Sequence, residues 1–111
     1  MEQSEELLNE LCRYWQAELG LQHWKIEVKV VRGVEIGEMC GQNDYSFTEE
    51  TALIRIKSAD DYHGYYPYNM EKVLVHELLH LVLDDARHES SMYYEQAINR
   101  LSQTLLKLKR K

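Results

Sequence analysis

Apolar residues along this chain recur with two different periods, and each change of period marks a new element. Between Leu7 and Leu19 they recur every three or four positions, which predicts an N-terminal helix. Ser4 and Gly20 are placed to begin and end that helix. From 24 to 31 apolar residues occupy every second position, which predicts a strand with one buried face.

Two more strands are predicted at 38–47 and 51–57, of which the first is the weaker. A proline-free apolar stretch at 70–85 predicts a helix capped by Asn69. A last helix follows a polar break at 84–91. The order helix, three strands, helix, helix predicts an α+β fold, with a small, mostly antiparallel three-stranded sheet packed against helices.

Composition and charge narrow the class of protein. The chain has 111 residues, enough for a single domain, 1–111, with one hydrophobic core. Its net charge of −6 argues against nucleic-acid binding, which needs clustered lysine and arginine. No apolar run is long enough to cross a membrane, and the first twenty residues lack the pattern of a signal peptide. Two cysteines are too few for a disulfide framework, so a cytoplasmic protein is expected.

The candidate chemistry lies in one motif, His76-Glu77-Leu78-Leu79-His80, inside the predicted helix. A helix turns about 100° per residue, so the two histidines lie one above the other on one face. Two neutral imidazoles at this spacing can bind one zinc ion. Glu77 flanks that face and can act as general base on a water molecule without binding the metal. The motif therefore predicts a zinc site that hydrolyses a peptide bond.

A catalytic zinc generally takes three protein ligands, and we expect Glu95 to be the third. It lies near the start of the last helix, on the edge that faces the helix of the motif. An antiparallel pair of helices joined by a short break would bring its carboxylate toward both imidazoles. Two alternatives stay open: Glu95 is only an exposed first-turn glutamate, or His88 in the polar break supplies the third ligand.

Two further residues stand one helical turn beyond a predicted ligand. Asn99 follows Glu95 by four positions, and Asp84 follows His80 by four. Each can hydrogen-bond a ligand histidine and fix its tautomer, as residues behind metal ligands commonly do. The ordinary alternatives are a solvated helix asparagine for Asn99 and a helix end for Asp84.

With these residues the chain resembles the small single-domain zincin-like metallopeptidases of bacteria and phages, of the gluzincin or minigluzincin type. The resemblance covers 24–106 and is strongest in the motif at 76–81 and in the strand 51–56. Larger gluzincins carry an aspartate four residues after the ligand glutamate, where this chain has Asn99.

This resemblance implies a site and a mode of substrate binding. It implies zinc on His76, His80 and Glu95, with Glu77 as general base. It also implies that the strand 51–57 is an edge of the cleft, along which an extended peptide substrate adds as a further strand. A zinc-dependent metallopeptidase is therefore the expected function.

Two other functions stay open. One is a zinc-binding module with little or no peptidase activity and a binding or regulatory role, because a chain this short has little room for specificity pockets. The other is an SprT-like protease acting on DNA-associated proteins, although this chain is acidic and lacks a cysteine zinc ribbon. Most of the eight tyrosines lie just before the motif helix or Glu95, and none is assigned to catalysis.

Overall fold

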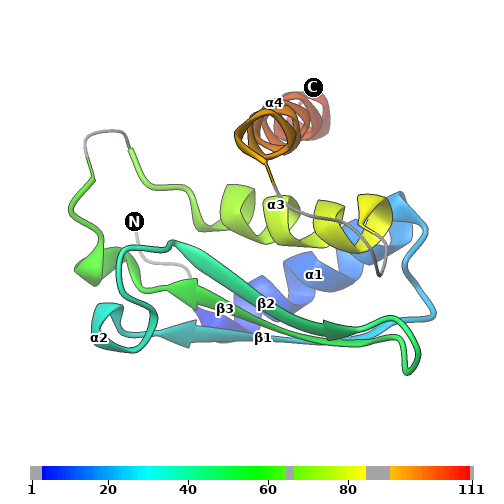
Figure 1. Ribbon diagram of the computed structural model, residues 1–111, viewed down its shortest axis with the longest axis horizontal. Helices are drawn as coiled ribbons and strands as arrows, with labels where there is room; N and C mark the ends of the chain where they lie inside the picture. Colours follow the sequence, from blue (N-terminus) through cyan, green and yellow to red (C-terminus); the bar gives the residue numbers. More distant parts are fainter. Residues whose placement is uncertain (1–3, 65–66, 85–90, 111) are drawn as a thin grey trace.

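The computed structural model describes residues 4–64, 67–84 and 91–110. In chain order its elements are α1 (Glu5–Leu19), β1 (Lys25–Val31), α2 (Gly33–Ile36), β2 (Gly41–Ser46), β3 (Thr51–Lys57), the short 3₁₀ helix η1 (Ala59–Asp61), α3 (Met70–Leu83) and α4 (Met92–Lys109). Figure 1 shows α1 and α3 on one side of the sheet and α4 on the side of α3 that faces away from it. The predicted α+β class is confirmed.

Helix α1 begins and ends, and helix α3 begins, at the capping residues that the sequence predicted. The Ser4 hydroxyl accepts the N–H of Leu7 at 3.0 Å, and Gly20 adopts the left-handed conformation that ends α1. Asn69 caps α3 by accepting the N–H of Lys72 at 3.1 Å. Two short helices were not predicted, the four-residue α2 and the three-residue η1, because both are too short to show a hydrophobic period.

The sheet has the order β1-β3-β2. β2 pairs antiparallel with β3, whereas β1 pairs parallel with β3, with Val28 opposite Ile54. The sheet is therefore mixed, and the prediction of a mostly antiparallel sheet is wrong. The reason is topological: β2 turns back through 47–50 into β3, which then enters between the other two strands in the direction of β1.

The prediction that 51–57 forms an edge of the sheet is also wrong. β3 is the middle strand and has hydrogen-bonded neighbours on both sides, so no substrate strand can be added to it. The two edges are β1 and β2. A peptide that binds by strand addition must therefore use one of these two strands instead.

Polar side chains of α1 cover the outer edge of β1. Asn9 donates to the carbonyl of Val28 at 2.9 Å and accepts the N–H of the same residue at 3.0 Å. The other bonds to this edge come from further residues on the same side of α1: Glu5 to Val30, Arg13 to Ile26, and Gln16 to Trp24. These bonds occupy backbone groups that an added strand would need.

The outer edge of β2 is open. Lys57 donates its N–H to the carbonyl of Cys40, which fixes the register, so alternate residues of β2 face β3 and the others face outward. The outward backbone groups belong to Gly41, Asn43 and Tyr45. Within the described ranges no hydrogen bond to these groups is found.

The core lies between the sheet and the helices α1 and α3. Its fully buried side chains include Leu8 and Cys12 of α1, Val28, Ile54 and Ile56 of the sheet, and Leu74, Val75 and Leu78 of α3. α3 thus packs one stripe on the core and leaves the opposite stripe for other contacts. No helix in the described part of the chain has the length and apolar character needed to cross a membrane.

Candidate metal centre

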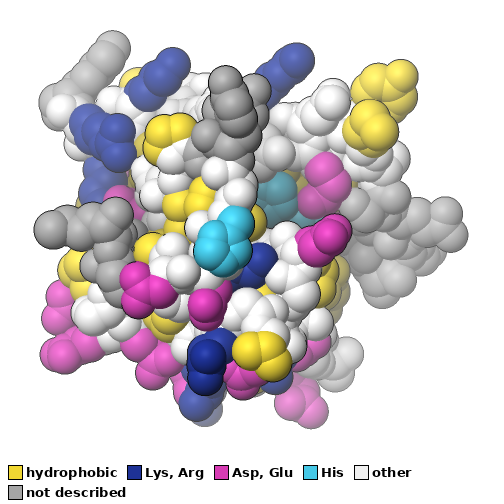
Figure 2. Space-filling view, turned by 90° about the vertical axis from the view of Figure 1, so that its left-hand side faces the viewer, with side chains coloured by type: hydrophobic (Ala, Val, Ile, Leu, Met, Phe, Trp, Pro, Cys, Tyr) yellow, Lys and Arg dark blue, Asp and Glu magenta, His cyan; other side chains and the backbone are white. Residues whose placement is uncertain are grey.

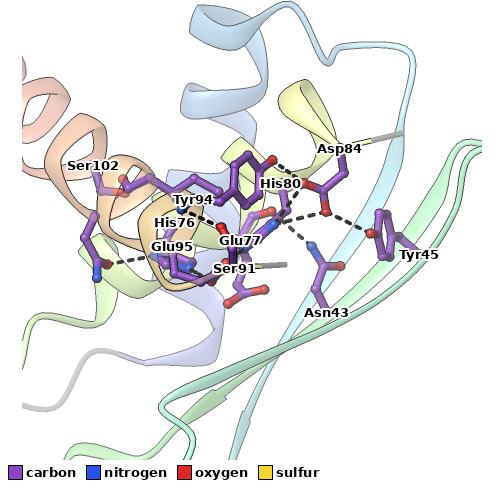
Figure 3. Close-up of polar contacts among 12 residues, drawn as sticks. Asn43, Tyr45, His76, Glu77, His80, Asp84, Ser91, Tyr94, Glu95 and Ser102 are labelled. Atoms are coloured by element: carbon purple, nitrogen blue, oxygen red, sulfur yellow. Dashed lines mark hydrogen bonds and ion pairs between the residues drawn. The ribbon is translucent and has the colours of Figure 1, made fainter. Parts of the chain in front are cut away.

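The second stripe of α3 faces the first turns of α4, and the candidate metal centre lies between these two helices (Figure 3). Glu95 Oε1 lies 3.1 Å from His76 Nε2 and 3.2 Å from His80 Nε2. One ligand atom from each of the three side chains lies within 4.8 Å of the others. Ligand atoms bound to a tetrahedral zinc at about 2.0–2.1 Å lie about 3.3 Å apart. The three groups therefore have the spacing of a metal-ligand set.

Hydrogen bonds behind each imidazole fix its tautomer. His76 Nδ1 lies 2.8 Å from Asn99 Oδ1. His80 Nδ1 lies 3.0 Å from Asp84 Oδ2. Both partner atoms are acceptors, so each Nδ1 carries the hydrogen and donates it. The structure thus brings Asn99 and Asp84 to the positions that the sequence predicted.

This arrangement leaves the two Nε2 atoms of the neutral rings with lone pairs that point toward the Glu95 carboxylate. Lone pairs facing a carboxylate are favourable only if the rings become protonated or a cation lies between the groups. With neutral rings the donor set therefore requires a cation. The chemistry of the residues present fits a bound metal ion.

Asp84 is held by two phenols as well as by His80. Tyr45 donates to Asp84 Oδ2 at 2.9 Å, and Tyr94 donates to Oδ1 (Figure 3). Burial would raise the pKa of Asp84, but the hydrogen bonds from Tyr94, Tyr45 and the imidazole outweigh it and lower that pKa. Burial likewise opposes protonation of His80, but the hydrogen bond and charge of Asp84, together with the charges of Glu95 and Glu77, outweigh burial and raise the pKa of His80.

The two phenols could not be predicted from the sequence. Tyr45 lies 39 positions before Asp84, on a strand whose place in the sheet was not known, so no local pattern links the two residues. Tyr94 precedes Glu95, and its position in the first turn of α4 was the only available signal. The two phenols join β2 and α4 to the end of α3, which fixes the side of the centre nearest His80.

Glu77 lies among the metal-site side chains, on the side of β2 (Figure 3). Asn43 of β2 donates to the Glu77 carbonyl at 3.0 Å. Burial raises the pKa of the Glu77 carboxyl; the two histidines oppose this rise, whereas the charges of Glu95 and Asp84 add to it. A carboxyl with a raised pKa can take up and release a proton nearer neutral pH than an exposed one.

A groove of about 460 Å³ opens beside the centre, on the side of His76. Its described walls come from the start of β2 and the segment before it, from the segment before α3, and from α3 and α4. They are Met39, Cys40, Gly41, Tyr62, Pro67, Tyr68, Asn69, Lys72, Val73, His76, Glu77, Glu95 and Asn99. The candidate general base and two of the candidate ligands thus face a space that a ligand can enter.

The remaining histidines give no second cluster in the part of the chain that the structure describes. His23 pairs with Glu50 at 2.8 Å, on an exposed turn. His63 is exposed and belongs to no group of candidate ligands. The rival third ligand, His88, lies outside the described residues.

Comparisons of this chain with protein-family models, with curated proteins and with solved structures gave no match. His76, His80 and Glu95 form a cluster at ligand distance that can hold a metal ion.

Proposed function

We propose that this chain is a zinc-dependent metallopeptidase. The observation that carries the proposal is the convergence of His76 Nε2, His80 Nε2 and a Glu95 carboxylate oxygen beside the buried carboxyl of Glu77. Two imidazoles and one carboxylate are a ligand set of catalytic zinc, and three protein ligands leave a fourth position open. Softer metals would favour sulfur ligands, which this cluster lacks.

In this proposal, three residues would bind the metal and a fourth would transfer the proton during hydrolysis. His76, His80 and Glu95 would hold zinc, which when bound supplies a Lewis acid for attack on a carbonyl. Glu77 would orient the attacking water, accept its proton and deliver that proton to the leaving amine nitrogen. The raised pKa of Glu77 suits this exchange, because a carboxyl of ordinary pKa releases a proton more readily but accepts one less readily near neutral pH.

The open edge of β2 is the proposed binding site for the substrate backbone. The outward N–H and C=O groups of Gly41, Asn43 and Tyr45 can pair with an extended peptide. Two side chains of the same strand contact the metal-site region: Asn43 donates to the Glu77 carbonyl in α3, and Tyr45 donates to Asp84. A peptide on this edge would therefore lie beside the metal centre. This edge replaces the strand 51–57 as the expected substrate contact.

The direct test compares wild type with Glu77→Gln, both loaded with zinc, on a degenerate peptide mixture. New peptide termini are identified by mass spectrometry. We expect wild type to cleave and the variant to lose at least about 100-fold in rate, because general-base catalysis contributes factors of about 10² to 10⁴. Zinc content should be equal in both proteins. A zinc-loaded wild type that cleaves nothing would contradict the peptidase function and leave a metal-binding module.

A further inference from the structure

The groove beside the metal centre is lined by a lysine that can contact a bound substrate. Lys72 precedes His76 by four residues on α3, so the two side chains lie on the same face, about 6 Å apart along the helix. Both line the groove. Side chains on one face of an extended peptide are spaced by about 6.6 Å, so a substrate residue at or near the scissile bond can reach Lys72.

Lys72 carries a charge that the described residues leave unpaired. Its side chain makes no ion pair or hydrogen bond within the described ranges; its hydrogen bond to the Asn69 side chain comes from its backbone N–H. Some other cations of the fold have partners: Lys109 lies 2.5 Å from Glu71, and Arg55 lies 2.5 Å from Asp44. Among the described residues that line the groove, Lys72 is the only lysine or arginine.

Aromatic and apolar side chains line the same groove as Lys72. The rings of Tyr62 and Tyr68 stack with their centroids 4.4 Å apart. The Tyr68 hydroxyl donates to the carbonyl of Lys57 at 2.7 Å, so this aromatic wall is fixed to β3. Pro67 adds a further apolar surface to the groove. A charge pair formed against such walls is screened less than one in open water.

The net charge of −6 limits how this protein could attract a negatively charged ligand. Figure 2 shows Asp and Glu side chains in the lower part of one face and Lys and Arg side chains mainly in its upper part, and the molecule as a whole is negative, so its net charge gives a negatively charged ligand no long-range attraction. Charges more than about 8–10 Å apart are largely screened at physiological salt. Selection of an anionic group must therefore come from direct contact with one cation inside the groove.

We propose that Lys72 selects peptides that carry a carboxylate next to the scissile bond. This inference rests on the proposed function, because it assigns substrate specificity to the same groove. The carboxylate has two possible sources, an Asp or Glu side chain within the peptide or the free C-terminus of the peptide. Both would form the same charge-assisted hydrogen bonds with the Lys72 ammonium.

The test measures binding rather than cleavage, in zinc-loaded Glu77→Gln. Fluorescent peptides of one alanine-rich sequence carry Glu or Gln at each position in turn, with a free or an amidated C-terminus, and affinities are read by anisotropy. We expect one Glu peptide, or the free-acid set, to bind roughly tenfold more tightly than its Gln or amide partner. A preference at one internal position identifies a side chain as the source, and a preference for the free acid identifies the terminus.

Three variants in the same background identify the cation. Lys72→Met should abolish the preference, and Lys72→Glu should reverse it toward peptides with Lys at that position, which a merely misfolded protein would not do. Lys107→Met, an exposed lysine of α4, should change nothing. Equal binding of Glu and Gln peptides, or an unchanged preference in Lys72→Met, would overturn the inference.

The two proposals fail in different ways. Selective binding in Glu77→Gln combined with no cleavage by wild type would refute the peptidase function and keep the role of Lys72. Cleavage by wild type without any preference for a carboxylate would keep the peptidase function and refute the role of Lys72.

Discussion

At the scale of single residues, each imidazole of the candidate metal centre has one nitrogen engaged and one directed at the centre. Asn99 engages Nδ1 of His76, and Asp84 engages Nδ1 of His80. The second nitrogen of each ring then faces Glu95. Because this division is set by hydrogen bonds outside the ligand cluster, the affinity for a metal should depend on residues that never touch it.

Asp84 offers the sharpest test of this dependence. We expect Asp84→Ala to weaken zinc binding by about 10- to 100-fold, because His80 loses the partner that fixes its tautomer. Asp84→Asn keeps an acceptor for His80 but removes the charge, so its loss should be smaller. Competition with a chromophoric chelator measures both affinities. Wild-type affinity in Asp84→Ala would contradict the assignment.

Gly41 marks the closest approach of β2 to α3. A Cβ at this position would lie 2.7 Å from Val73 Cγ1 and 3.0 Å from Glu77 Oε2. We expect Gly41→Ala to lower the free energy of unfolding by about 1–3 kcal/mol, because the side chains of Val73 and Glu77, or the backbone that carries them, must shift. Peptidase activity should fall with the displacement of Glu77, whereas zinc content should persist.

Urea denaturation, elemental analysis and a cleavage assay on the same sample check this prediction. Gln42→Ala is the matched control, since the side chain of Gln42 lies on the opposite face of β2. Unchanged activity and stability in Gly41→Ala would show that the close approach does not constrain Glu77.

Much of the candidate site could be predicted because it depends on helical geometry. A spacing of four residues places His76 beside His80 and Glu95 beside Asn99, whatever the rest of the fold does. The contributions of β2 could not be predicted in the same way. Tyr45 reaches Asp84 only because β2 lies at the edge of the sheet nearest α3, and no local pattern encodes the order of strands.

At the scale of elements, the hydrophobic periods predicted the positions of α1, β1, β3 and α3 correctly but not the order of the strands. β1 and β3 are the apolar strands, and each follows its alternating pattern. β2 is polar, with the sequence Gly-Gln-Asn-Asp-Tyr-Ser, which matches a strand that is exposed along one edge. Two alternating strands are compatible with parallel or antiparallel pairing, so the mixed sheet became visible only in the structure.

The hydrogen bonds from α1 to the edge of β1 predict a loss of stability when one of them is removed. Asn9 satisfies both the N–H and the C=O of Val28, so Asn9→Ala leaves two backbone groups without these partners. We expect this substitution to lower the free energy of unfolding by about 1–3 kcal/mol. Urea denaturation measures the loss, and Glu10→Ala, at the exposed neighbouring position, should be close to neutral. Equal stability of the two variants would contradict the edge-covering role of α1.

At the scale of the whole molecule, the metal centre depends on how α4 docks against α3. The far end of this pair is fixed by Glu71, whose Oε2 accepts from Trp15 Nε1 at 2.7 Å and from Lys109 Nζ at 2.5 Å. These contacts join α1, α3 and α4 more than three helical turns from Glu95. The position of Glu95 is thus supported from both ends of α4, by Lys109 and by the phenol of Tyr94.

Cys12 makes the free energy of unfolding fall as the pH becomes alkaline. Burial raises the pKa of this core thiol from 9.0 to about 11, although Arg13 partly opposes the shift. The unfolded chain therefore loses this proton before the folded protein does. The stabilisation is complete below pH 9 and is lost as the pH rises toward 11, by about 2 kcal/mol.

Urea denaturation at a series of pH values between 8 and 11 tests this dependence. Cys12→Ala is less stable at neutral pH, because a buried side chain is truncated, but it should show a flatter decline across the alkaline range. Parallel declines in wild type and variant would assign the alkaline loss to other groups.

The central claim is that His76, His80 and Glu95 together form one metal site, and zinc titration of the metal-free protein tests it most directly. Calorimetry on wild type, Glu95→Ala and His88→Ala gives the number of sites and the affinity of each protein. We expect wild type to bind one zinc per chain, Glu95→Ala to bind at least about 100-fold more weakly, and His88→Ala to match wild type. Absence of zinc binding in wild type, or undiminished binding in Glu95→Ala, would contradict the account.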